Sequence, residues 1–285
     1  MTAAVLVAEA PRERNVWGVI AKTFVQAFLI CLGIVVLYPL LWMAFSGFKN
    51  NAQIFGNPFA LPEVWAWGNY VQAWNQGVRN YITISLLVTV ASGICTVLVS
   101  AWTAYGLTRT RMPAKPLVVG FVLGGLMLSP TVAVIPLVKM MQALGLYNTY
   151  WALIVLYTAF RIPFSTFLIR AYMLDLPRDV DEAARIDGAT ESQIFWKITM
   201  PLCRPIIVSC MVLHTLFAWN EYLFAMIFSG AQQTLPVGLT SIMATHGTNY
   251  AVVFAAMTIS ALPIVLVFFA AQRYFIRGLS EGIGK

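Results

Sequence analysis

Apolar runs long enough to cross a lipid bilayer recur along the whole chain. A hydrocarbon core of roughly 30 Å needs about 20 consecutive apolar residues in a helix. Helices satisfy every backbone polar group internally, and the alternating pattern of a barrel strand is absent. The sequence therefore predicts an all-α membrane protein. Its six expected transmembrane helices are Val19–Phe45, Ile82–Leu107, Leu117–Val138, Trp151–Ala171, Ile206–Phe228 and Val252–Tyr274.

Composition agrees with this class of protein. Of the 285 residues, 60% are apolar and only 10% are charged, whereas a soluble domain is about one quarter charged. Linkers, low-complexity tracts and evident repeats are absent from the sequence. We expect an N-terminal tail over residues 1–18 and one six-helix domain over residues 19–285.

Lysine and arginine are sorted by loop. The N-terminal tail, the second and fourth connections and the C-terminus carry most of the 18 basic residues, while the opposite side has only Lys49, Arg79 and Lys139. The positive-inside rule then predicts that both termini and the fourth connection are cytoplasmic. Because topology accounts for the net charge of +7, we expect membrane lipid around the chain and no nucleic-acid partner.

The third span contains several glycines and two prolines. Pro130 and Pro136 predict a bent or broken helix. Gly120 and Gly124 form a G-x-x-x-G face suited to close helix contact. Helix packing is one interpretation of these glycines, and a part in a transport pathway is the other.

The fourth connection, about residues 177–201, is charged and predicts a helix, a tight turn and a second helix. Acidic residues in the first turn complement the positive end of the first helix. Gly188 stands where a left-handed C-terminal cap is needed. Thr190 and Gln193 predict a capping box for the second helix, whose Ile194 and Phe195 would lie back on the bundle.

Two interpretations of this loop differ in the use of its small residues. An amphipathic surface helix would explain the charges alone. A self-contained loop, however, has no need for the narrow contact face that Ala183 and Ala184 offer. We therefore predict that a soluble partner receives this turn, with Glu182 facing a basic residue of that partner.

The stretch Glu182-Ala183-Ala184-x-x-Asp187-Gly188-Ala189, followed by Ile198-x-x-Pro201, resembles the EAA loop of permease subunits in ATP-binding-cassette importers. From about residue 20 to the C-terminus the chain is similar to the carbohydrate-uptake branch, the MalG-like permeases. The stretches that carry this second resemblance are Ala218–Leu223, Leu235–Leu239 and Gln272–Leu279.

The resemblance implies a type I importer (MetI-like) fold with a cytoplasmic coupling helix. The implied coupling residues are Glu182, Ala183, Ala184, Arg185, Asp187 and Gly188. It also implies a heterodimer with a second permease, a cytoplasmic ATPase dimer, and an extracytoplasmic binding protein that delivers a sugar or polyol. Closure of the ATPase dimer would draw the coupling helices together and rock the permeases between inward-facing and outward-facing states.

The chain lacks a nucleotide-binding loop of its own. No G-x-x-x-x-G-K-[ST] motif occurs, and the terminal Gly284-Lys285 lacks both the spacing and the following Ser or Thr. We therefore expect this chain to be no enzyme and to hold no cofactor or metal, with ATP and Mg²⁺ bound by the partner ATPase.

Two charged residues fall inside predicted spans. Arg161 costs about 2.5–3.5 kcal/mol to insert at membrane depth, so it should face the bundle interior. At 1.5 Å rise per residue, Arg161 lies roughly 15 Å below the outer end of its span and Glu221 about 10–12 Å below its own. Similar depth suggests that the two pair, directly or through Asn220. Such a pair either lines the translocation path or joins two helices structurally.

Arg161 departs from the family pattern, which has a small or apolar residue there. A charged substrate such as a phosphorylated polyol is therefore an alternative to a neutral sugar. His214, among leucines, is expected to be a hydrogen-bonded core histidine and not a proton carrier. An ion-coupled secondary transporter would need an inverted repeat and several carboxylates in the membrane. An intramembrane enzyme would need a nucleophile–base pair or a metal cluster. The sequence has neither set of features.

Overall fold

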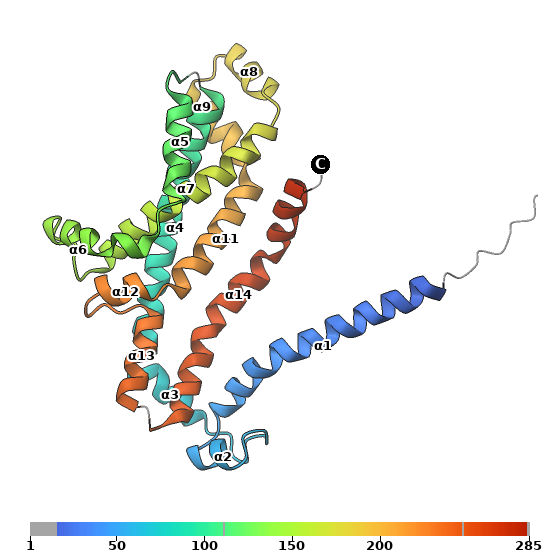
Figure 1. The fold of residues 1–285 in the computed structure, drawn as a ribbon, viewed down its shortest axis with the longest axis vertical. Helices are drawn as coiled ribbons and strands as arrows, with labels where there is room; N and C mark the ends of the chain where they lie inside the picture. The colour runs from blue at the N-terminus through green and yellow to red at the C-terminus, as the bar shows by residue number, and fades with distance from the viewer. Residues whose placement is uncertain (1–15, 111, 247, 284–285) are drawn as a thin grey trace, which may run out of the picture.

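The computed structural model describes residues 16–110, 112–246 and 248–283, and within them every regular element is a helix (Figure 1). The predicted tail therefore lies largely outside the described residues, and the first helix already begins at Val16. The elements are α1 (Val16–Ser46), α2 (Asn51–Gly56), α3 (Trp67–Ala73), η1 (Trp74–Val78), α4 (Arg79–Arg109), α5 (Lys115–Gly125), η2 (Pro130–Ala133), α6 (Val134–Ala143), α7 (Tyr150–Asp175), α8 (Asp179–Ile186), α9 (Glu191–Ile194), η3 (Phe195–Thr199), α10 (Met200–Leu202), α11 (Arg204–Asn220), α12 (Leu223–Phe228), α13 (Leu235–His246) and α14 (Tyr250–Ile283).

The all-α membrane fold is confirmed. Among the described residues, four helices are long and apolar enough to cross a membrane, and the number rises to six if each of two sharply bent helix pairs is one span. The bent pairs are Lys115–Gly125 with Pro130–Ala143 and Glu191–Leu202 with Arg204–Asn220. Four predicted spans correspond to α1, α4, α7 and α14.

The third predicted span is broken, as its prolines indicated. Its two halves meet at 88° across the residues between Gly125 and Pro130. The G-x-x-x-G face does not pack inside this chain, because a Cβ atom on Gly120 or Gly124 would meet nothing within 4 Å. Gly125 instead fits closely against the ring of Pro163 on α7.

The fifth predicted span, Ile206–Phe228, is wrong as a single helix. α11 ends at Asn220, the backbone is extended at Glu221, and the short helix α12 follows. Neither proline nor glycine marks this break. It is held by side-chain hydrogen bonds that the apolar pattern does not reveal.

The bundle is centred on α4 and α7, which pack along each other (Figure 1). One buried cluster joins them to α12 through Val88, Tyr157 and Phe228. A second cluster lies toward α8 and α9 and includes Ile169, Ile194 and Phe195. Ile194 and Phe195 thus lie back on the bundle as predicted.

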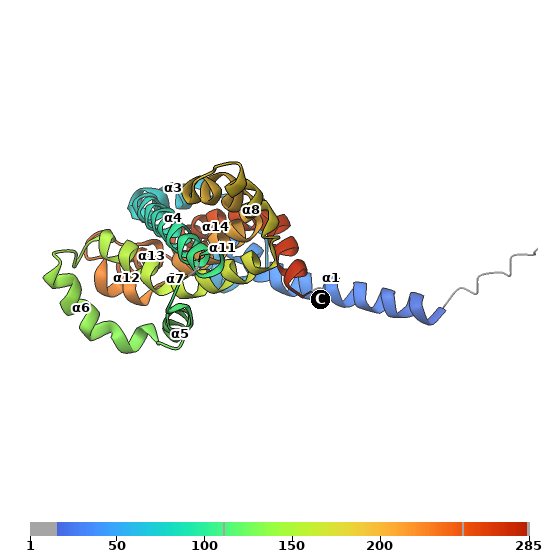
Figure 2. The same ribbon diagram turned by 90° about the horizontal axis from the view of Figure 1, so that it is seen from above.

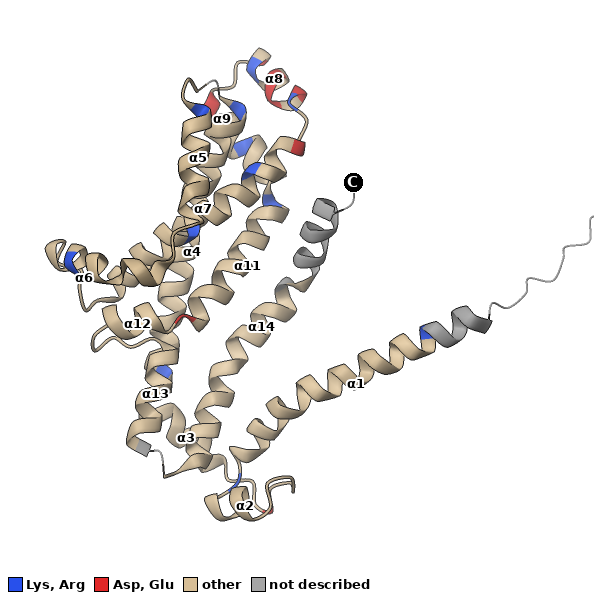
Figure 3. Cartoon of the chain, viewed as in Figure 1, with Lys and Arg blue, Asp and Glu red and all other residues tan. Residues whose placement is uncertain are grey.

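α1 extends away from the bundle in both views (Figures 1 and 2). Its apolar span is 0% buried, and it contacts α14 near its last turns, where Trp42 packs edge-on against Phe254. Most charged residues lie toward the end of the bundle that carries α8 and α9 (Figure 3). The long helices between the two ends are almost free of charge in the described region, as a hydrocarbon environment requires.

Candidate functional site

The charged loop forms the predicted helix–turn–helix. Asp179, Asp181 and Glu182 occupy the first turn of α8, where carboxylates interact favourably with the helix dipole. Gly188 has φ of +82°, in the left-handed region that glycine adopts without strain. The Ala189 amide donates to the Ala184 carbonyl at 2.9 Å, and the Gly188 amide donates to the Arg185 carbonyl at 3.1 Å. This is the bond pattern of a Schellman cap.

The second helix of the loop starts with the predicted capping box. The Gln193 amide donates to Thr190 Oγ1 at 3.3 Å, and the Thr190 amide donates to Gln193 Oε1 at 2.9 Å. These reciprocal bonds satisfy backbone donors that the first turn of a helix otherwise leaves free. The direction of α9 is therefore fixed from within the loop.

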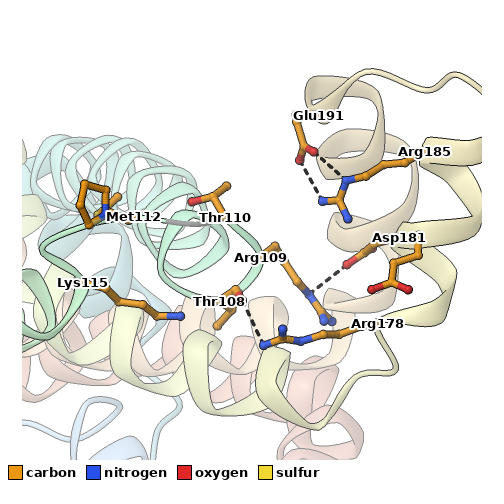
Figure 4. Close-up of a pocket in the computed structure, with 11 residues that line it drawn as sticks. Thr108, Arg109, Thr110, Met112, Lys115, Arg178, Asp181, Arg185 and Glu191 are labelled. Atoms are coloured by element: carbon orange, nitrogen blue, oxygen red, sulfur yellow. Dashed lines mark hydrogen bonds and ion pairs between the residues drawn. The ribbon is translucent and has the colours of Figure 1, made fainter.

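α8 is also tied to the end of α4, a connection that the sequence did not suggest. The Arg109 guanidinium lies 3.0 Å from the Asp181 carboxylate, and each side chain is only 4% exposed (Figure 4). Arg109 also donates to the Leu176 carbonyl at 3.1 Å. Arg178 donates to the Thr108 carbonyl at 3.5 Å. The charged loop is therefore attached to a long helix by charged side chains on both segments.

A second link joins α8 to α9 and back to α4. Arg185 makes two hydrogen bonds to the Glu191 carboxylate, at 2.8 and 3.3 Å, and the Tyr105 hydroxyl donates to the same carboxylate at 2.7 Å. The hydrogen bonds from Arg185 and then Tyr105 lower the pKa of Glu191 below its ordinary value. Glu191 therefore connects α8, α9 and α4 through one carboxylate.

The two faces of α8 have different environments. Asp181 is buried and Ala184 is half-buried against the second cluster, whereas Glu182, Ala183 and Ile186 are exposed. Ile186 is 87% exposed and adds an apolar side chain to this face. Beside α8, a polar cleft of about 1040 Å³ opens toward the start of α5 at Lys115. The free face of the helix is therefore small, partly apolar and flanked by charge.

This arrangement refines the predicted contact residues. Glu182 and Ala183 are exposed, and their contact with a partner stays a prediction. Ala184 packs partly against the second cluster of its own chain, and Arg185 is engaged by Glu191. Ile186 was missed by sequence reasoning, although an isoleucine between Arg185 and Asp187 was a detectable signal.

Inside the membrane region, the predicted Arg161–Glu221 ion pair does not form. The Arg161 guanidinium lies over the rings of Phe164 and Phe217, at 4.7 and 5.0 Å from their centres. It also donates to the Leu213 carbonyl at 3.5 Å. Cation–π contacts and a carbonyl thus accommodate its charge. Arg161 meets α11 at Leu213 and Phe217, whereas Glu221 meets α7 at Tyr157, so the two charged residues lie at different levels of the bundle.

Glu221 holds the break between α11 and α12. Its carboxylate accepts hydrogen bonds from the Tyr157 hydroxyl at 2.6 Å and from the amides of Phe224 and Ala225 at 2.8 and 3.0 Å. Tyr157 is fully buried on α7. The carboxylate therefore caps α12 and ties it to the core, which is a structural role.

Asn220 differs from its neighbour. It is exposed, its side-chain amide donates to the Leu216 carbonyl at 2.8 Å, and it lines a groove with Trp219. His214 is fully buried with its Nε2 2.8 Å from Ser92 Oγ, so the predicted hydrogen-bonded core histidine is confirmed. Within the described residues, no group of three or more His, Cys, Asp or Glu side chains is placed to hold a metal ion.

The chain is similar to known transport proteins over nearly all its length. The family described as "Binding-protein-dependent transport system inner membrane component" matches residues 116–281. The probable ABC transporter permease protein YurM of Bacillus subtilis is 43% identical over 96% of this chain and 92% of its own length. The diacetylchitobiose uptake system permease protein NgcG of Streptomyces coelicolor is 33% identical, over 90% of this chain and 87% of its own.

A solved structure shares the fold. In the crystal structure of a bacterial ABC transporter that imports the acidic polysaccharide alginate, one chain superposes with a TM-score of 0.78. It covers 94% of this chain and 100% of that chain, at 22% sequence identity. The overall helical fold is therefore shared with a known importer chain.

Proposed function

Because the chain belongs to the family of binding-protein-dependent transport system inner membrane components, we propose that it forms half of the translocation path of a carbohydrate importer. The chain is a permease subunit of an ATP-binding-cassette importer and a multi-pass protein of the inner membrane. It is a transport component and not an enzyme. A separate ATPase and an extracytoplasmic binding protein act with it.

A neutral sugar or polyol is the proposed substrate class. The relative NgcG is a permease for diacetylchitobiose, and its similarity extends over most of both chains. The alternative of a charged substrate rested on Arg161. That side chain packs on aromatic rings and is not among the residues lining the groove beside Asn220. Of the three proposed path residues, Asn220 has the position best suited to contact a substrate, whereas Arg161 and Glu221 support the helices around it.

A second permease is the proposed neighbour within the membrane, in a heterodimer surrounded by lipid. The apolar span of α1 has no buried part in this chain, and the face of α5 at Gly120 and Gly124 is open. Both surfaces are suited to helix packing against another apolar subunit. The charged end of the bundle (Figure 3) supports a cytoplasmic location for α8. A cytoplasmic location for both termini is proposed from the distribution of basic residues along the sequence.

The ATPase is proposed to receive the exposed face of α8, through Glu182, Ala183 and Ile186. Asp187 and Gly188 complete the turn, and Arg185 stabilises it through Glu191. ATP and Mg²⁺ would bind to the ATPase and not to this chain. The observation that carries this proposal is the buried contact of Arg109 with Asp181, which gives α8 a firm attachment to α4 while its other face stays free.

The test is a bulky substitution on that face. We expect Ala183→Trp to lower co-purification of the ATPase and ATP-driven uptake by about tenfold, the effect of roughly 1.4 kcal/mol of lost binding. Ala143→Trp, at an exposed alanine ending α6, is the matched control and should change neither. Full ATPase binding and uptake in the Ala183→Trp protein would contradict the proposed docking face.

A further inference from the structure

A groove of about 340 Å³ lies where α11 ends, and α13 and α14 form its other walls. It is within the size range of small-molecule sites. None of the described residues that line it carries a charge. An ion in such a place would lack a counter-charge and would be strongly disfavoured. The groove therefore suits a neutral molecule.

The end of α11 gives this groove hydrogen-bond acceptors. Carbonyls in the last turn of a helix accept no hydrogen bond from an amide of the same helix. They also form the negative end of the helix dipole. Trp219 and Asn220 belong to that turn and line the groove. The Asn220 amide nitrogen donates to the Leu216 carbonyl, which leaves its oxygen as a further acceptor.

The same groove also offers a donor and apolar surface. The indole nitrogen of Trp219 has no hydrogen-bond partner among the described residues, and an indole N–H acts only as a donor. Met43 and Met257 contribute flexible apolar side chains. A sugar ring matches this mixture, because its hydroxyls both donate and accept while its C–H groups are apolar.

The groove is also well placed along the chain. α11 runs from the coupling loop to the groove, and its seventeen residues span roughly 25 Å. The turn at Glu221 fixes where the helix stops, through Tyr157 and the amides of α12. The acceptors at the end of α11 are therefore held in place by a core residue and not by the ligand.

We propose that this groove is a carbohydrate-binding subsite contributed by this chain, with Asn220 and Trp219 as the recognition residues. The inference rests on the proposed function as a carbohydrate permease and adds where, and by which groups, the sugar is held. Asn220 and the carbonyls at the end of α11 accept from sugar hydroxyls, and Trp219 donates to a sugar oxygen. The methionines cover the apolar face of the ring.

The test uses the complete importer in proteoliposomes with its binding protein, second permease and ATPase. Radiolabelled maltose, trehalose and diacetylchitobiose are the probes, and uptake is compared with binding-protein-stimulated ATP hydrolysis. We expect Asn220→Leu to reduce uptake of the accumulated sugar about tenfold, as for the loss of about one hydrogen bond, while ATP hydrolysis stays within about twofold. The matched control is Asn80→Leu, at an exposed asparagine on α4 that does not line the groove. This variant should leave uptake and ATP hydrolysis unchanged.

Trp219→Phe is the second variant, since it removes only the N–H donor and keeps an aromatic ring. It decides the question if Asn220→Leu does not assemble. The subsite proposal is overturned if Trp219→Phe transports normally and Asn220→Leu either transports normally or fails to assemble. A wild-type importer that hydrolyses ATP but accumulates none of the three sugars overturns the carbohydrate function itself, and the subsite with it.

Discussion

The guanidinium of Arg109 lies 3.0 Å from the carboxylate of Asp181, at the point where α4 meets α8. Arg109 Nε and Asp181 Oδ2 do not form an aligned hydrogen bond, so the contact between them is mainly an ion pair. With both side chains buried, its attraction is screened little by solvent. Removing one partner leaves the other charge buried alone, whereas removing both does not.

Asp181→Asn is therefore expected to destabilise the attachment of α8 by about 3–5 kcal/mol. Hydrogen exchange of the α8 amides and thermal unfolding in detergent would measure the loss. The double variant Arg109→Met with Asp181→Leu should recover most of it, because no charge is left unpaired. A double variant less stable than Asp181→Asn would show that the charges themselves are needed.

Glu221→Ala removes the acceptor of three hydrogen bonds and leaves the fully buried Tyr157 hydroxyl without its partner. We expect a loss of about 2–5 kcal/mol in stability, visible as a lower thermal midpoint of the detergent-solubilised protein. Glu221→Gln keeps one carbonyl oxygen and should lose less. Equal losses in the two variants would argue against hydrogen bonding as the cause.

Gly238 on α13 lies directly against Tyr81 of α4. A Cβ atom at this position would overlap Cδ2 of the tyrosine ring. Gly238→Ala should therefore cost about 1–3 kcal/mol through overpacking and reduce the yield of folded protein. Combining it with Tyr81→Ala should relieve the clash, and a double variant that gains nothing over Gly238→Ala would contradict this cause.

Gly188→Ala isolates a backbone effect. A Cβ atom there meets nothing within 4 Å, so the cost comes only from φ of +82° and should be about 1–2 kcal/mol. Gly188→Asn should cost less, because asparagine tolerates the left-handed region better than alanine. Thermal unfolding and ATPase co-purification of the two variants would test this order, and a reversed order would contradict it.

Local signals in the sequence predicted the parts of the structure that depend on neighbouring residues. The break between Gly125 and Pro130, the cap at Gly188 and the box at Thr190 all arise from such signals. The break at Glu221 escaped prediction because its acceptor pairs with Tyr157 from a distant helix. The failed Arg161 pairing has the same origin, since a linear pattern gives neither the offset of two helices along each other nor the rotation of each about its axis.

Helix α8 of the candidate site also has a rotation that the sequence did not predict. Ala183 and Ala184 are identical in type and adjacent, so the sequence offered no means of separating them. The contact of Asp181 with Arg109 determines the rotation of α8, and that rotation turns Ala184 inward and leaves Ala183 outside. Ile186 then falls on the outer face.

The splayed position of α1 has a consequence for biosynthesis. This helix leaves the ribosome before the rest of the bundle, yet only its last turns near Trp42 touch α14, a segment made at the end of translation. During synthesis most of its apolar surface is therefore exposed to lipid. Matched production of the proposed second permease would then determine how long the newly made protein survives cellular quality control.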